Sequence, residues 1–286
     1  MGTILRKILP PFLILSLALG LISCVPGEVQ ITEEELVERV ATAAENIKTC
    51  QFDMNVKIDM SGKSKDKTME MSMLLNNTSI IDNVNKKRLM KTVMMMPEKG
   101  KAPQSVETEA YFVNDVMYMK MNLPGMPEQW VKQKMPQDFW ERQNQIKQLV
   151  ELLKASQIEI LGSERINNTD CWVIKVTPDL KKLWQTAMQQ WGLIKPLVKD
   201  ENLDLEKIVK NVAQKQWVAK DTYFTIKTQT QMSLIMSSEN LNLPLEEEFE
   251  INIDESIDLT FHNYNEPVSI ELPPEAEKAT ELPKTK

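Results

Sequence analysis

Apolar and polar residues alternate strictly along the segment that begins at Phe52, and this period of two constrains the fold more than any other feature of the chain. The apolar positions of this segment are Phe52, Met54, Val56, Ile58 and Met60. The same period returns in two further stripes, Met69, Met71 and Met73, and Met117, Met119 and Met121. Because successive side chains of a strand point to opposite faces, the pattern predicts an antiparallel sheet with one apolar and one wet face.

Further segments are predicted to extend this sheet. Asn114-Asp115 separates two apolar runs, which is a signal for a tight hairpin. We expect a turn at Ser61–Ser64. The other expected strands are Arg88–Met96, Ser105–Val113, Gln157–Leu161, Cys171–Val176, Gln216–Ala219, Tyr223–Met236, Glu248–Ile253 and Ile257–Tyr264.

Four segments have the period of amphipathic helices instead. Thr32-Glu33-Glu34-Glu35 is a capping box, and the helix that it opens is expected to run to about Thr49. A second helix is expected to open at Asp138. Thr177 is the expected cap of a third, and a shorter helix is expected from Leu203 to about Ala213. Strands and helices together predict an α+β fold.

Met1–Ser23 has the features of an export signal. Its uncharged run, Ile8–Ile22, is shorter than the ~20 residues that a membrane span needs. The run ends in Leu21-Ile22-Ser23-Cys24, which matches the lipobox of prokaryotic lipoproteins. We expect a signal peptide over residues 1–23, lipidation of Cys24, and a short tether over residues 24–31 to the extracytoplasmic face of the cell membrane. An uncleaved anchor with an incidental Cys24 is the alternative.

The composition excludes several classes of protein. The formal net charge is -7, and the most basic run is Asn85-Lys86-Lys87-Arg88, which argues against a nucleic-acid partner. The 8 glycines are too dispersed for a phosphate-binding loop. His262 is the one histidine, so a two-histidine zinc site is excluded. We expect no catalytic residue, no metal site and no cofactor.

Four features in a fixed order carry a resemblance to a known group of proteins. The lipobox is followed almost at once by a helix and an alternating strand (Glu45–Phe52), then by a hairpin (Asn167–Pro178), a strand pair (Trp217–Phe224) and a last strand that leads into Phe261–Pro273. This order resembles the LolA/LppX-like lipoprotein-carrier superfamily. The resemblance implies a curved antiparallel half-barrel whose concave face is covered by helices, around an apolar cavity for acyl chains. The domain would span residues 32–276, followed by a loose polar tail over residues 277–286.

The methionines suggest what the cavity would hold. Of the 18 methionines, 14 lie between Met54 and Met135, and thioether side chains repack easily around an irregular apolar ligand. A methionine-rich core is the alternative interpretation. The candidate cavity residues are Phe52, Met54, Val56, Ile58, Met69, Met71, Met73, Met117, Met119, Met121, Trp184 and Met188.

The expected function follows from the anchor and the cavity together. It is a membrane-anchored lipoprotein that binds an apolar ligand, a lipid or acyl chain, without catalysis. The alternative is an envelope sensor or interaction module on the same fold, with a membrane protein as its partner.

Cys50 and Cys171 remain once Cys24 is lipidated. In an exported protein such a pair suggests a disulfide, which would join the start of the first strand to a strand in the middle of the chain. Two buried free thiols are the alternative.

Overall fold

A computed structural model describes residues 31–64, 67–97, 100, 103–122, 125, 127–136, 139–142, 145–190, 204–241 and 248–282. The expected signal peptide, Cys24 and most of the tether lie outside these residues. From Glu33 onward the chain forms one compact unit. Among the described residues, no helix is both long enough and apolar enough to cross a membrane.

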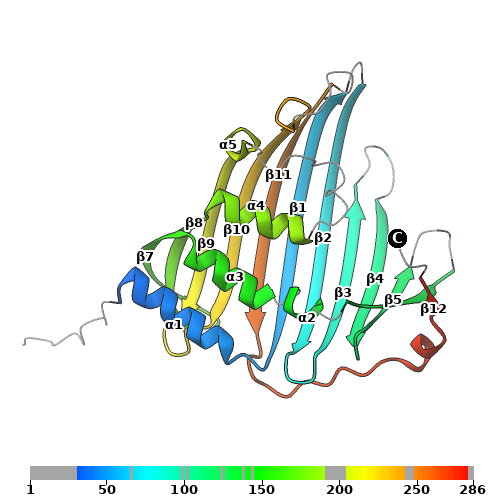
Figure 1. The fold of residues 1–286 in the computed structure, drawn as a ribbon, viewed down its shortest axis with the longest axis horizontal. Helices are drawn as coiled ribbons and strands as arrows, with labels where there is room; N and C mark the ends of the chain where they lie inside the picture. Colours follow the sequence, from blue (N-terminus) through cyan, green and yellow to red (C-terminus); the bar gives the residue numbers. More distant parts are fainter. Residues whose placement is uncertain are drawn as a thin grey trace, which may run out of the picture. The chain divides into compact units, whose positions relative to one another are not determined.

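One sheet of 12 strands organises the described part of the chain (Figure 1). The strands are β1 (Thr49–Ser64), β2 (Lys67–Asp82), β3 (Lys87–Met96), β4 (Gln104–Val113), β5 (Val116–Asn122), β6 (Gln129–Lys134), β7 (Gln157–Ile166), β8 (Thr169–Thr177), β9 (Val209–Ala219), β10 (Thr225–Ser237), β11 (Phe249–His262) and β12 (Thr280–Glu281). Their order across the sheet is β12-β6-β5-β4-β3-β2-β1-β11-β10-β9-β8-β7. Neighbours are antiparallel except β12 and β6, which are parallel. The sheet is open, because β12 and β7 are its two ends.

A few helices accompany the sheet. They are α1 (Glu33–Glu45), α2 (Phe139–Arg142), α3 (Gln145–Lys154), α4 (Leu180–Gln190), α5 (Leu205–Ile208) and the 3-10 helix η2 (Pro274–Lys278). Figure 1 shows α1, α3 and α4 crossing in front of the strands, on one side of the sheet. Ala44 of α1 and Ile146 and Leu149 of α3 pack against a buried cluster that contains Cys50 and Phe52 of β1. The helices therefore cover the lower end of β1.

The strand register places all the predicted apolar stripes on one face of the sheet. Directly paired residues of antiparallel strands share a face. Ile58 pairs with Met73, Met60 with Met71 and Gly62 with Met69, so the second stripe lies on the face of the first. The pairs Cys50↔Ile81, Ile81↔Arg88, Arg88↔Phe112 and Phe112↔Met117 carry the same face to the third stripe. The predicted apolar face is confirmed, and Asp53, Asn55 and Lys57 are exposed on the other face.

The hairpin prediction is confirmed and the turn prediction is wrong. Asn114 and Asp115 have φ of 52° and 57°, as a two-residue hairpin of the type I′ class requires. Ser61–Ser64 is instead the end of β1, which pairs with both β2 and β11 up to Ser64. Gly62 has no turn role: a Cβ there would lie 2.6 Å from the carbonyl oxygen of Glu250. The glycine allows β11 to approach.

Several helix predictions also need correction. α1 ends at Glu45 rather than near Thr49, because the strand that follows begins at Thr49. The predicted cap Thr177 is the last residue of β8, and Asp179 caps α4 instead: its Oδ1 accepts a hydrogen bond of 2.7 Å from the backbone N–H of Lys182. The helix expected from Leu203 to Ala213 is only α5. β9 begins at Val209, and the pairing of this part of β9 with β10 overrides a weak helical pattern.

Two strands predicted near the C-terminus are one. Glu248–Ile253 and Ile257–Tyr264 merge into β11, and its pairing with β1 runs without a break through Glu255. The tail expected to be loose is ordered up to Leu282. Thr280 pairs with Val131 of β6, and Ala279 is buried. The strand β6 itself is not among the strands predicted from the sequence.

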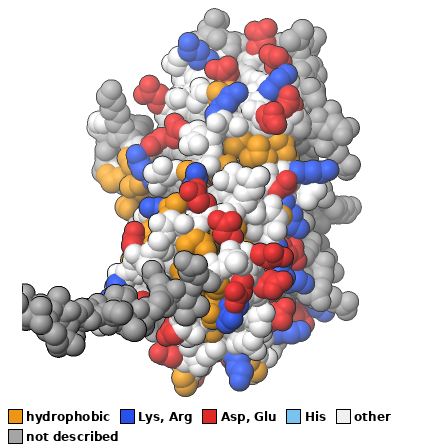
Figure 2. Space-filling view, turned by 90° about the vertical axis from the view of Figure 1, so that its left-hand side faces the viewer, with side chains coloured by type: hydrophobic (Ala, Val, Ile, Leu, Met, Phe, Trp, Pro, Cys, Tyr) orange, Lys and Arg blue, Asp and Glu red, His pale blue; other side chains and the backbone are white. Residues whose placement is uncertain are grey.

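Charges mark the edge of the sheet at β7. Lys175 of β8 lies 3.5 Å from Glu159 of β7, and Arg165 lies 3.8 Å from Asp170. Figure 2 views this side and shows acidic and basic side chains mixed across it, with smaller hydrophobic patches between them. Charged side chains on an edge strand hinder pairing with another chain.

Candidate functional site

A cavity of about 240 Å³ lies between the apolar face of the sheet and helices α3 and α4. Its lining is largely apolar, and it comes from β1, β9, β10, β11, the two helices and Pro178, which lies between β8 and α4. The lining residues are Phe52, Met54, Gln148, Leu149, Leu152, Pro178, Leu183, Val212, Gln214, Thr228, Thr230, Met232, Ile257, Leu259 and Phe261. Ligand sites in proteins are typically lined in this way, by apolar side chains with a few polar groups among them.

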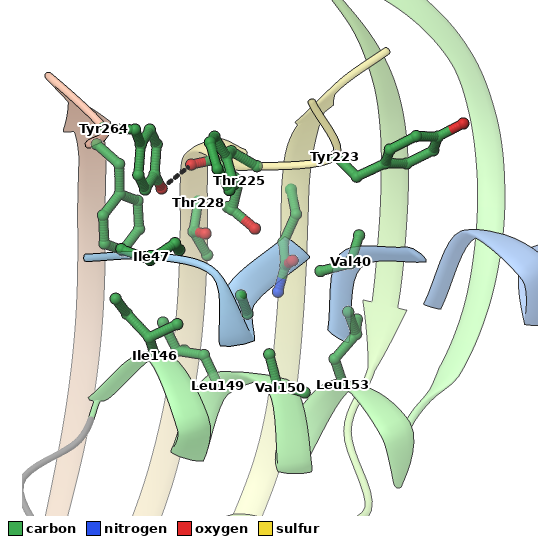
Figure 3. A pocket seen from close by; sticks show the side chains of 14 residues that line it. Val40, Ile47, Ile146, Leu149, Val150, Leu153, Tyr223, Thr225, Thr228 and Tyr264 are labelled. Atoms are coloured by element: carbon green, nitrogen blue, oxygen red, sulfur yellow. Dashed lines mark hydrogen bonds between the residues drawn. The ribbon is translucent and has the colours of Figure 1, made fainter. Parts of the chain in front are cut away.

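A smaller cavity of about 30 Å³ adjoins the first at the level of α1 (Figure 3). Figure 3 shows Ile146, Leu149, Val150 and Leu153 of α3 turned into the cavity, toward α1, which contributes Val40. Leu149, Thr228 and Phe261 line both cavities, so one set of side chains separates them. A change of rotamer at Leu149 would alter the space on both sides.

One wall of the larger cavity is polar. Gln216 donates from Nε2 to Oε1 of Gln214 at 3.2 Å, and Gln214 donates from Nε2 to Oγ1 of Thr230 at 3.1 Å. Thr228 is 4% exposed, and within the described part of the chain its hydroxyl has no hydrogen-bond partner. A buried unpaired hydroxyl is costly, so this wall offers one hydrogen bond to a ligand oxygen or a bound water.

Aromatic side chains lie where the two cavities meet. Phe52 and Phe261 line the larger cavity, and their rings lie 5.7 Å apart. Phe224 and Tyr264 line the smaller cavity, and their rings stack at 4.5 Å. Tyr264 donates a hydrogen bond of 2.5 Å to the carbonyl oxygen of Thr225, which Figure 3 marks with a dashed line. Burial raises the pKa of Tyr264 well above its ordinary value, so its hydroxyl stays protonated at neutral pH.

The twelve residues proposed from the sequence do not all meet at this cavity. Phe52 and Met54 line it, and Val56 is buried on the same face. Ile58 and Met73 are half-buried. Met69 and Met71, on the same face but farther along β2, are 44% and 37% exposed. The apolar face therefore extends beyond the part that the helices cover.

The remaining candidate residues lie away from the lining. Met117, Met119 and Met121 share the apolar face but belong to β5, and β2, β3 and β4 separate them from β1. Trp184 is half-buried on α4, beside the lining residue Leu183. Met188 is on α4, but its side chain is outside the described part of the structure.

The predicted disulfide is wrong. Cys50 and Cys171 are both free and buried, on β1 and β8. β11, β10 and β9 lie between these strands, and at about 4.8 Å per strand the two cysteines are too far apart for the ~7 Å limit on Cα atoms in a disulfide. The alternative of two buried thiols holds, and burial raises the pKa of Cys50 to about 12.

Sequence reasoning missed several lining residues for identifiable reasons. Val212 lies in the segment with a helical pattern, and Gln214 follows it directly. Thr228 and Thr230 are polar, so an apolar pattern does not mark them as lining residues. Ile257 and Leu259 lay in a predicted strand whose alternation does mark them as face-sharing residues. Leu149 carried a signal too, since it belongs to the apolar stripe of α3.

The fold and the cavity together define the class of this protein. Its members have an open sheet, antiparallel except at one edge, and a largely apolar cavity between one face of the sheet and the helices that pack on it. By sequence, residues 32–281 match the family model DUF6612, described as a family of unknown function. The chain belongs to this family. No curated protein matches the sequence.

Solved structures with a similar fold include the LolA/LppX-like proteins that the sequence resemblance named. LprF from Mycobacterium bovis is 14% identical, with 84% of this chain and 96% of that chain covered and a TM-score of 0.42. The lipoprotein LppX from Mycobacterium tuberculosis is 13% identical, with 84% of this chain and 100% of that chain covered and a TM-score of 0.35. A LolA superfamily protein from Nitrosomonas europaea is 11% identical, with 85% of this chain and 96% of that chain covered and a TM-score of 0.23. These likenesses concern the fold alone.

Proposed function

We propose that this chain is a membrane-anchored lipoprotein that binds a lipid or acyl chain, without catalysis, in the cavity between its sheet and helices α3 and α4. In this proposal Cys24 carries the anchor, residues 24–31 are the tether, and the domain from residue 32 lies at the extracytoplasmic face of the cell membrane. The helices cover the concave face of the curved sheet.

The observation that carries the proposal is the lining of the cavity. Eleven of its 15 residues are hydrophobic or proline, and the four others are the uncharged Gln148, Gln214, Thr228 and Thr230. A water-filled site would need several polar partners for each water, and this lining offers three polar side chains on the sheet and Gln148 on α3.

The apolar face continues past the helices, which supports a ligand longer than the cavity. Met60, Met71 and Met69 follow Ile58 and Met73 along β1 and β2, and Met69 and Met71 are among the most exposed large hydrophobic side chains of the described residues. Each buried methylene of an acyl chain contributes about 0.8 kcal/mol, while association costs about 4–15 kcal/mol. The balance favours reversible binding, as a carrier requires.

The cavity has no group of its own for catalysis among its described lining residues. The described lining contains no titratable side chain. His262 lies on the other face of the sheet, with its Nε2 3.1 Å from Oδ2 of Asp53. Neither group is placed to act on a molecule in the cavity.

The alternative function is that of an interaction module that binds a protein through the same face. The exposure of Met69 and Met71 favours it, because exposed apolar patches mark sites of association. The two functions make different predictions for small acyl ligands, since a protein-binding face would not retain them.

The experiment that tests the proposal is a titration of residues 25–286 with a fluorescent acyl ester. Met54→Trp, which puts a larger side chain into the cavity, should weaken binding at least about tenfold. Asn55→Trp is the matched control, since Asn55 is the next residue of β1 and is exposed on the opposite face. Equal binding by both variants and the wild type would show that the ligand does not occupy the cavity.

A further inference from the structure

Glu255 is an acidic residue on the apolar face of the sheet. It pairs with Ile58 of β1 on one side and Met232 of β10 on the other, so its side chain lies on the face of these two residues. Along β11 its neighbours on the same face are Ile253 and Ile257. The charge thus interrupts an apolar row of four strands, Met73-Ile58-Glu255-Met232.

The position of Glu255 is next to the cavity. Met232 and Ile257 line the cavity, and Glu255 is directly opposite the first and two residues from the second. Two residues of a strand span about 6.7 Å. Glu255 therefore lies at the end of the cavity that faces the exposed part of the apolar face.

The acidic residues on the opposite face of the same strand are differently placed. Asp254 accepts a hydrogen bond of 2.6 Å from Ser233, and Asp258 accepts one of 2.6 Å from Gln229. Within the described residues Glu255 has neither a hydrogen-bond nor an ion-pair partner. Its neighbours on the apolar face of β1, β2, β9 and β10 carry no charge, and Lys182 of α4 pairs with Glu151 of α3 at 3.2 Å. Burial raises the pKa of the Glu255 carboxyl.

We infer that Glu255 selects the ligand by its polar end: the cavity takes an acyl lipid whose head donates hydrogen bonds, through a hydroxyl or an ammonium group, and rejects a free carboxylate. This inference rests on the proposed function and names the substrate class of the same site. A donor would satisfy the carboxylate oxygens in a region with little water, where such bonds are strong. A fatty-acid carboxylate would instead place two negative charges close together in apolar surroundings.

The test compares two ligands with one acyl chain. Residues 25–286 are loaded with a fluorescent acyl ester, and 1-monopalmitoylglycerol and palmitate are each used to displace it near neutral pH. The wild type should favour the glycerol ester by about tenfold or more. Glu255→Gln should bind palmitate about tenfold more tightly and so lose most of this preference. Palmitoyl ethanolamine ester, with an ammonium group, should follow the glycerol ester in the wild type.

Glu250→Gln is the matched control, because Glu250 is exposed on the opposite face of the same strand. It should leave the preference unchanged. Equal binding of ester and palmitate by the wild type, or an unchanged preference in Glu255→Gln, would overturn the inference and leave the proposed function standing. If no acyl ligand binds at all, the proposed function fails with it.

A stability measurement separates ligand selection from a structural role. Because the folded state holds the Glu255 proton more tightly than the unfolded state, this carboxyl lowers stability as the pH rises above its ordinary pKa. Glu255→Gln should therefore raise the melting temperature at neutral pH and have less effect near pH 4. A lower melting temperature at neutral pH would mean that Glu255 has a structural partner, which would overturn the inference.

Discussion

The guanidinium of Arg88 lies over the ring of Phe52, with its central carbon 5.6 Å from the ring centroid. Both side chains are buried, Arg88 with 4% and Phe52 with 2% of its surface exposed. Nε of Arg88 donates to Oγ of Ser79 at 3.1 Å. Burial lowers the pKa of Arg88 to about 10, which still leaves it charged at neutral pH. The charged side chain of Arg88, on β3, thus packs against Phe52, which lines the cavity.

Replacing this side chain tests how much it stabilises the fold. Arg88→Ala should reduce the free energy of unfolding by about 3 kcal/mol, because it opens a void beside Phe52 and removes a charge-assisted hydrogen bond. Chemical denaturation measures the change. Lys91→Ala, on the same strand, is the control, since the Lys91 side chain is 60% exposed and its ion pair with Glu109 should contribute little. Equal effects of the two variants would contradict the role given to Arg88.

The state of the two cysteines is open to direct measurement. With Cys50 and Cys171 both buried and the thiol of Cys50 held protonated, iodoacetamide should modify neither in the folded protein near pH 8. After denaturation without reductant it should modify both. Mass spectrometry counts the added groups. Thiols that react only after reduction would mean that a disulfide forms.

Gly62 tests the register of β1 against β11. Gly62→Ala places a methyl group where the carbonyl oxygen of Glu250 leaves no space, so the strands must separate locally. We expect a loss of about 1–3 kcal/mol in the free energy of unfolding. Ser61→Ala, at an exposed neighbouring position, should change it little. A Gly62→Ala variant as stable as the wild type would show that β11 does not approach here.

The anchor has its own test. Metabolic labelling with an alkyne fatty acid should mark the full chain and should not mark Cys24→Ala, because the lipobox cysteine is the expected acceptor. The Cys24→Ala chain should also leave the membrane fraction. Equal labelling of the two chains would exclude lipidation at Cys24.

The strands of this fold were predictable where their alternation is strong. Phe52 to Met60 and the two methionine stripes have a period that only a sheet satisfies, and the register shows that they share a face. α1 was predictable from its capping box, although its end was not, since Ile47 continues the helical spacing while its backbone has already left the helix.

What the sequence did not reveal depends on long-range pairing. Val209 and Val212 have a helical spacing, but their pairing with Leu234 and Met232 of β10 holds the segment as a strand. Glu255 interrupted an apolar pattern and so divided one strand into two, although the pairing with Ile58 and Met232 keeps it in the sheet. The cavity lining was only partly predictable, because four strands and two helices from distant parts of the chain contribute to it.

Native mass spectrometry of residues 25–286 as purified measures whether an acyl lipid occupies the cavity. We expect part of the wild-type protein to carry a bound species with the mass of a lipid, which is lost on gentle activation. Met54→Trp should carry much less of this species than Asn55→Trp. A wild-type protein that is free of lipid, and that stays free of it after incubation with 1-monopalmitoylglycerol, would show that the cavity does not bind acyl lipids.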